Sequence, residues 1–200
     1  MKHRIIADVS HLPTYDFGSG SPMWWGTLSF MTLEGMGFVL AIGSYFYLAY
    51  LAPGWPIAAP PPNLWPGTIV LGLLLASVIP NHMASTWARN QDLPKVRLGM
   101  VIMSIAGILP LIVRGFEFPG LQLSWDENAY GSILWFLLGL HTVHLITDVG
   151  DTIVLTILMF TRHAHSGKRF SDVSDNAFYW DFVVFSWAVL YLVIYWFPRL

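Results

Sequence analysis

The sequence contains no cysteine among its 200 residues. This absence excludes disulfide bonds, thiolate metal sites and cysteine nucleophiles, and it removes thiols as an indicator of the redox compartment. The phosphate-binding glycine loops, the Gly-x-Ser-x-Gly turn and the His-Glu-x-x-His zinc motif are also missing. The common enzyme signatures that these motifs carry are therefore absent.

Charged residues are scarce as well. They make up 11% of the chain, whereas 55% of it is hydrophobic. Ordinary soluble domains carry about 25% charged residues. The apolar residues stand in long blocks, and about 20 apolar residues suffice to cross the hydrocarbon layer of a membrane. We therefore expect a single membrane domain and no separate soluble one.

The apolar blocks predict an all-α membrane protein, a bundle of five transmembrane helices. Their expected ranges are 26–51, 67–87, 96–114, 129–160 and 177–197. A polar N-terminal segment, 1–25, precedes the membrane domain, 26–200. The apolar run after the basic residues 1–4 is too short for a signal peptide, so we expect no cleaved leader. We expect a multi-pass protein of the cell inner (plasma) membrane.

The placement of basic residues predicts the orientation. Lys and Arg favour the cytoplasmic side of short loops. Eight of the ten lie in the N-terminal segment and in the second and fourth loops: Lys2, Arg4, Arg89, Lys95, Arg97, Arg162, Lys168 and Arg169. The other two are Arg114 and Arg199. The N-terminus should therefore lie inside and the C-terminus outside.

Glu34 is an acidic residue within the first expected span. It lies about eight residues, or roughly 12 Å, from the start of that span, and no basic residue is near it in sequence. A charged group within lipid is costly, so such a residue is a candidate functional site. A carboxyl group that exchanges protons or contacts lipid fits this position, and so does a neutral Glu hydrogen-bonded to a neighbouring helix for structure.

A polar stripe occupies the fourth expected span, formed by His141, His144, Asp148 and Asp151. Their steps of three, four and three residues place all four on one helical face. Three interpretations stay open: a metal site, a proton relay, or a buried polar face hydrogen-bonded to another helix. The metal site is the least favoured, because no other span offers clustered ligands at a matching depth.

Two further positions can be satisfied locally. Arg114 and Glu117 are three residues apart at the end of the third span and could form a pair, with Glu117 in the loop that follows. Asp181 near the start of the fifth span is expected to make an interfacial hydrogen bond. The chain offers too few histidines for a membrane di-iron enzyme and no clear facing pair for haem, so we expect no redox cofactor in it.

The ordered motifs resemble subunit III of the haem–copper oxidases, in the short five-helix form of that family. The segment 177–183 (AFYWDFV) with Trp187 and the run 190–196 is similar to its last helix. Gly139, His141 and His144 resemble its Gly-x-His-x-x-His helix, and Glu117 resembles its Glu-Tyr motif. Glu34 stands where the family carries a buried carboxylate. The likeness covers roughly residues 22–197.

The resemblance implies a subunit without haem or copper of its own, these being in partner subunits of a cytochrome c or quinol oxidase. It would pack on subunit I, near subunit II, bind phospholipid in a cleft, and support proton uptake and sustained turnover. Glu34, Glu117, His141 and His144 match family positions, and lipid or proton-related roles are implied for them. Interhelical hydrogen bonds are expected of the two histidines.

The chain also departs from the family. Asp148 and Asp151 are unusual additions, and Asp181 stands where His is usual. These differences leave the electron donor open, and a complex of the nitric-oxide-reductase type remains an alternative. Two functions of other classes also remain, both centred on the polar stripe: a stand-alone metal-dependent membrane enzyme and a small proton-coupled transporter.

Overall fold

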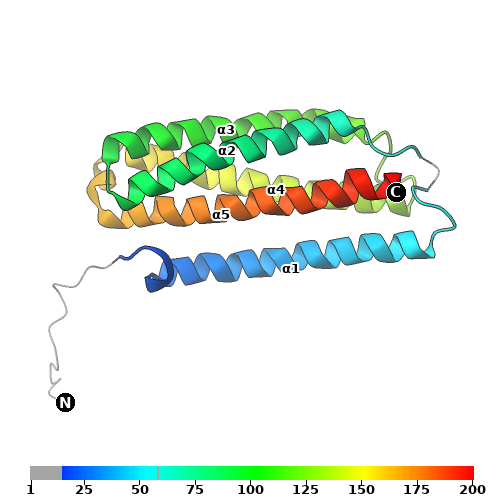
Figure 1. Ribbon diagram of the computed structural model, residues 1–200, viewed down its shortest axis with the longest axis horizontal. Coiled ribbons are helices and arrows are strands. Elements are labelled where there is room, and N and C mark those ends of the chain that lie inside the picture. Colours follow the sequence, from blue (N-terminus) through cyan, green and yellow to red (C-terminus); the bar gives the residue numbers. More distant parts are fainter. Residues whose placement is uncertain (1–14, 58) are drawn as a thin grey trace, which may run out of the picture.

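The computed structural model describes residues 15–57 and 59–200, so Lys2 and Arg4 lie outside the described residues. Five long helices run up and down along one axis (Figure 1). They are α1 (Pro22–Leu51), α2 (Leu64–Arg89), α3 (Leu93–Gly120), α4 (Ala129–Met159) and α5 (Gly167–Tyr191). The last continues as a π-helical turn, Leu192–Trp196, and a 3₁₀ turn, Phe197–Arg199. All five are long and apolar enough to span a membrane, which confirms the five-helix prediction.

Capping residues set the first turn of α1. The Ser21 hydroxyl accepts a hydrogen bond from the Met23 backbone N–H at 3.2 Å, and Pro22 occupies the first helical position. Both features favour a helix start, because they satisfy or remove backbone donors that have no partner within the helix. The helix therefore begins at Pro22, before the expected position 26.

The prediction of a loop over residues 161–176 is wrong for most of that range, because α5 already begins at Gly167. Phe170, Val173 and Ala177 are buried and recur every three to four residues, which is the period of a helical face. The end of α3 differs in the same way. It continues through Pro119 to Gly120, so Glu117 lies on a helix and not in a loop.

Helix α1 is the peripheral element of the bundle. It packs against α4 and α5 and runs along one side of the other four helices (Figure 1). In its most apolar stretch 11% of the residues are buried inside the protein, against 61% in the most apolar stretch of the last span, Gly167–Arg199. Most of the apolar surface of α1 therefore faces outward, toward lipid or another subunit.

The core forms where α3, α4 and α5 approach closely. Trp180 and Trp187 are its largest fully buried side chains. Gly107 in α3 faces this core, and a Cβ at that position would lie 2.7 Å from Val149 Cγ2 and 3.3 Å from the Trp180 ring. Small residues allow helices in membranes to approach closely, and Gly107 does so here.

One end of the bundle is basic. The start of α1, the α2–α3 turn and the α4–α5 connection lie there, and the C-terminus lies at the other end (Figure 1). In the α2–α3 turn, Lys95 Nζ lies 2.6 Å from Asp92 Oδ2. The hydrogen bond from Lys95 lowers the pKa of the Asp92 carboxyl below its usual value. Arg89, Lys95 and Lys168 thus share the end at which α1 begins.

The close contact at Gly107 can be tested by substitution. Gly107→Leu should lower the free energy of unfolding by about 1–3 kcal/mol, because the added side chain overpacks the interface with Val149 and Trp180. Thermal unfolding of the detergent-solubilised protein measures the effect. Gly72→Leu is the matched control, since a Cβ at Gly72 meets nothing within 4 Å. An equal loss in both variants would contradict the packing assigned to Gly107.

Candidate functional site: a groove between α1, α4 and α5

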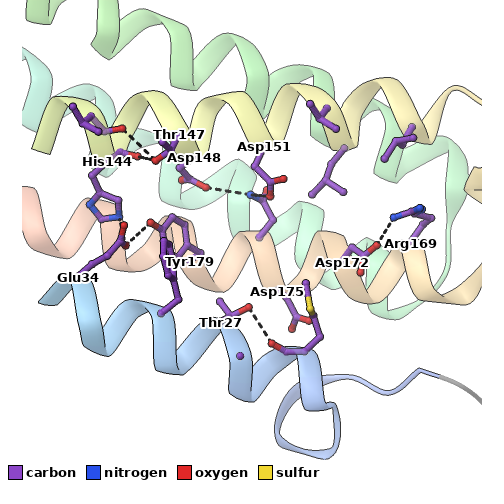
Figure 2. A pocket seen from close by; sticks show the side chains of 18 of the residues that line it. Thr27, Glu34, His144, Thr147, Asp148, Asp151, Arg169, Asp172, Asp175 and Tyr179 are labelled. Atoms are coloured by element: carbon purple, nitrogen blue, oxygen red, sulfur yellow. Dashed lines mark hydrogen bonds and ion pairs between the residues drawn. The ribbon is translucent and has the colours of Figure 1, made fainter.

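A groove of about 830 Å³ lies where α1 approaches α4 and α5. Its walls are largely apolar and include Met23, Phe30, Val143, Val154 and Leu158. Charged side chains enter it from all three helices (Figure 2). The groove is therefore amphipathic, with long apolar walls and polar groups set into them.

Glu34 joins the three helices in this groove. Its Oε2 accepts a hydrogen bond from the Tyr179 hydroxyl of α5, and His144 Nε2 of α4 lies 3.3 Å from the same oxygen (Figure 2). The approach of His144 does not have hydrogen-bond geometry, and neither ring nitrogen has a hydrogen-bond partner among the described residues. The Glu34 side chain is 22% exposed. This carboxyl is thus held by α5 and open to the groove.

A second polar contact follows farther along α4. The Asn176 side-chain amide of α5 donates to Asp148 Oδ1 at 3.2 Å and to Asp151 Oδ2 at 3.4 Å. Its carbonyl oxygen accepts from the Thr152 hydroxyl at 3.1 Å. Asp148 is buried and Asp151 is exposed. One asparagine therefore connects both aspartates of the stripe to α5.

Charges of both signs line the groove toward the basic end of the bundle. Arg169 Nη1 lies 2.8 Å from Asp172 Oδ2 (Figure 2), and Lys168 and Asp175 line the same region. Five carboxyl groups line the whole groove, against two basic residues: Glu34, Asp148, Asp151, Asp172 and Asp175 against Lys168 and Arg169. The groove is acidic in composition despite the basic residues near its end.

His141 belongs to a separate buried cluster. Arg114 Nη1 lies 2.6 Å from Glu117 Oε2, which confirms the expected pair, and Arg114 Nη2 lies 3.0 Å from His141 Nδ1. Because arginine only donates, His141 Nδ1 accepts, so Nε2 carries the proton and donates to the Val183 carbonyl at 3.2 Å. The Tyr195 hydroxyl donates to Glu117 Oε1. This cluster connects α3 and α4 to the final helix and its π-helical turn.

The structure thus divides the predicted stripe. His144, Asp148 and Asp151 line the groove with Glu34, whereas His141 lies with Arg114 and Glu117 in the second cluster. Among the described residues no group of three or more His, Cys, Asp or Glu could hold a metal ion, and the metal interpretation gains no support from this geometry. Asp181 accepts a hydrogen bond from Asn81 Nδ2 of α2 at 3.0 Å, but the expected position at the membrane interface is wrong, because α5 begins at Gly167 and Asp181 lies well inside it.

Sequence reasoning missed the partners of these residues. Tyr179, Asn176 and Tyr195 all belong to the last helix or its π-helical turn. The expected start of the fifth span at residue 177 places Asn176 in a loop, where a contact with α4 is not expected. The apolar residues Phe170 and Val173 are spaced as on one helical face, and this pattern indicates an earlier helix start. Asn176 then lies one turn before Tyr179 and Trp180 on the same helix.

Comparison with known proteins gives consistent matches over nearly the whole chain. The family model for cytochrome c oxidase subunit III matches residues 20–199. Cytochrome c oxidase subunit 3 of Drosophila yakuba is 27% identical over 206 residues, covering 94% of this chain and 76% of that protein. The protein of the same name from Synechocystis sp. is 26% identical over 174 residues, covering 85% and 73%. The probable cytochrome c oxidase subunit 3 of Mycobacterium bovis is 29% identical over 182 residues, covering 85% of both chains.

The buried pair predicts a large effect of a single substitution. Arg114→Met should lower the free energy of unfolding by about 3–5 kcal/mol, because it leaves the Glu117 carboxylate buried without its cation. Arg114→Met combined with Glu117→Gln should recover part of that loss. Thermal unfolding of the solubilised protein measures both variants.

The matched control for this prediction is Lys95→Met, which breaks an exposed pair with Asp92. Exposed pairs contribute about 0–1 kcal/mol, so this variant should unfold close to wild type. If Arg114→Met were no more destabilising than Lys95→Met, the assignment of Arg114 as the compensating cation would be wrong.

Proposed function

The chain belongs to the cytochrome c oxidase subunit III family, and from this premise we propose that it acts as a non-redox accessory subunit of a haem–copper terminal oxidase in aerobic respiration. Haem and copper would be held by partner subunits, with this chain packed on subunit I near subunit II. The observation that carries the proposal is the family match over residues 20–199, which includes all five spans. The names of the relatives favour cytochrome c as the electron donor.

The groove supports a role in binding phospholipid. Its length of apolar wall suits an acyl chain, and Lys168 and Arg169 at one end suit a headgroup phosphate. The basic end of a bundle is also the end expected at the membrane surface on the cytoplasmic side. A lipid in this position would fill the groove and so contact α1 on one side and α4 and α5 on the other.

The same charge distribution supports the proposed orientation. Among the described residues Arg89, Lys95 and Lys168 share the end of the bundle at which α1 begins, so that end would face the cytoplasm. The relatives from Synechocystis sp. and Mycobacterium bovis are bacterial proteins. They support a location in the inner (plasma) membrane of a cell.

Glu34 is the residue we propose to support proton uptake and turnover. It is partly exposed in the groove and fixed by the Tyr179 hydroxyl, and His144 Nε2 lies 3.3 Å from its Oε2 without a hydrogen bond. A carboxyl group in this setting can gain and lose a proton without moving. His141 and Glu117 are buried in the other cluster. We assign them a structural role, in which their hydrogen bonds hold the helices in place.

The assignment to an oxidase complex predicts co-purification. An affinity-tagged chain, isolated from its native membrane in mild detergent, should carry haem-bearing subunits, read by visible absorbance before and after reduction. A tagged membrane protein of unrelated sequence serves as the control. Isolation of the chain free of haem and with a stoichiometric transition metal would favour the stand-alone metal-dependent enzyme instead.

The role of Glu34 is tested in that same complex. Glu34→Ala should reduce proton uptake and shorten sustained turnover, because it removes the only carboxyl group on α1 among the described residues. Oxygen consumption and proton uptake by vesicles containing the complex measure the effect. Asp126→Ala, in an exposed loop, is the control. Full turnover and full proton uptake after Glu34→Ala would reject a functional role for this carboxyl.

A further inference from the structure

Two aspartates of the groove share a single hydrogen-bond donor group. The Asn176 amide nitrogen has two N–H bonds, and they point to Asp148 Oδ1 at 3.2 Å and Asp151 Oδ2 at 3.4 Å. The carbonyl oxygen of Asn176 is taken by the Thr152 hydroxyl, which fixes which way the amide faces. Asp148 therefore receives one N–H bond from Asn176, and that amide has none left to give.

Asp148 is a buried carboxyl group of the groove with one oxygen unsatisfied, and Asp175 Oδ2 is unsatisfied in the same way. Asp148 is 2% exposed, and its Oδ2 has no hydrogen-bond partner among the described residues. No Lys or Arg of that part of the chain lies within ion-pair distance of it. Two lone pairs of a buried carboxylate oxygen would thus be without a donor, which proteins avoid.

The surroundings of Asp148 add negative charge. The titratable and charged groups that line the groove with it are Glu34 from α1, His144 and Asp151 from α4, and Lys168, Arg169, Asp172, Asp175 and Tyr179 from α5. Arg169 is already paired with Asp172. Lys168 is exposed at the end of the groove. An ionised Asp148 would therefore have Asp151 as its nearest charged neighbour along the helix, without a basic partner.

Three kinds of ligand could compensate this carboxyl group. A metal ion would need at least three suitable side chains, and the described residues offer no such group. An ammonium group would need an accessible oxygen, whereas Asp148 Oδ2 is buried. A proton on the carboxyl group needs neither further ligands nor an accessible oxygen. A buried neutral carboxyl with one unpaired O–H is far less costly than a buried unpaired carboxylate.

We propose that Asp148 holds a proton at neutral pH, and that Asp148, Asn176 and Asp151 form a proton-binding site in the wall of the groove. Asp148 is the buried storage position. Asp151, one turn farther along α4 and exposed, exchanges protons with water in the groove. The site lies beside Glu34 and Tyr179 but consists of residues other than those that match the subunit III family.

Infrared spectroscopy of the intact purified protein, with the subunits that accompany it, tests this site. The wild type at neutral pH should show the carbonyl stretch of a protonated carboxylic acid, shifted in heavy water. Asp148→Asn should remove one such band, because the isosteric amide carries no carboxyl proton. Asp126→Asn, in an exposed loop, is the matched control and should leave the band unchanged.

A second variant, Asp148→Glu, keeps the proposal testable if Asp148→Asn does not assemble. Asp148→Glu retains a carboxyl group, so its band should persist at a shifted frequency. In the wild type the band should disappear reversibly when the pH is raised well above neutral. A wild-type spectrum without a protonated carboxyl band at neutral pH, or a band unaffected by both substitutions at Asp148, would overturn the proposal.

A bound cation would give a different result. In that case the wild type would lack the band, and extraction would release an amine-bearing lipid that Asp148→Asn fails to retain. That outcome also overturns the proton assignment. The infrared band that Asp148→Asn removes belongs to this chain, whereas haem content reports its partners. Failure of this site and failure of the proposed function are therefore recognised separately.

Discussion

The buried ion pair of Arg114 and Glu117 holds α3, α4 and the end of the last helix together. Arg114 is 1% exposed and Glu117 is not exposed at all. A charge at this depth is tolerated only with a partner. The pair also contacts His141 of α4, Tyr195 of the π-helical turn and the Trp187 ring, whose centre lies 3.8 Å from the guanidinium carbon. The Arg114 Nε has no hydrogen-bond partner among the described residues. Three helices are therefore fixed in register by one ion pair.

The groove follows from this constraint. With His141 turned inward to Arg114, the next polar positions of α4 face α1, and His144 comes to lie 3.3 Å from Glu34. Helix α1 is too peripheral to close over them, because it packs mainly on α4 and α5 along one side of the bundle. Helix α1 thus covers the polar side of α4 at His144, where Glu34 approaches it. Farther along α4, toward Asp151, that side is open and Asp151 is exposed.

The two proposals for the groove use different parts of it. A phospholipid would lie along the apolar walls with its headgroup near Lys168 and Arg169, whereas the proton sits on the buried Asp148. The hydrogen bonds from Asn176 hold both aspartates against α5, whether or not the groove is filled. A bound lipid would limit water in the groove and so the rate at which Asp148 exchanges its proton.

Five spans, the spacing that allows Arg114 to pair with Glu117, and the common face of the polar stripe could all be predicted from the sequence. These depend on length, composition and spacing within one helix, which are local properties. The assignment of His141 and His144 to different sites required the packing of the whole bundle. They are three residues apart, about 60° in rotation, enough for different neighbours to cover them. Tyr179 and Tyr195, the donors to Glu34 and Glu117, lie 145 and 78 residues away. Periodicity predicts which side chains share a face, but the packing of the whole bundle selects what that face meets.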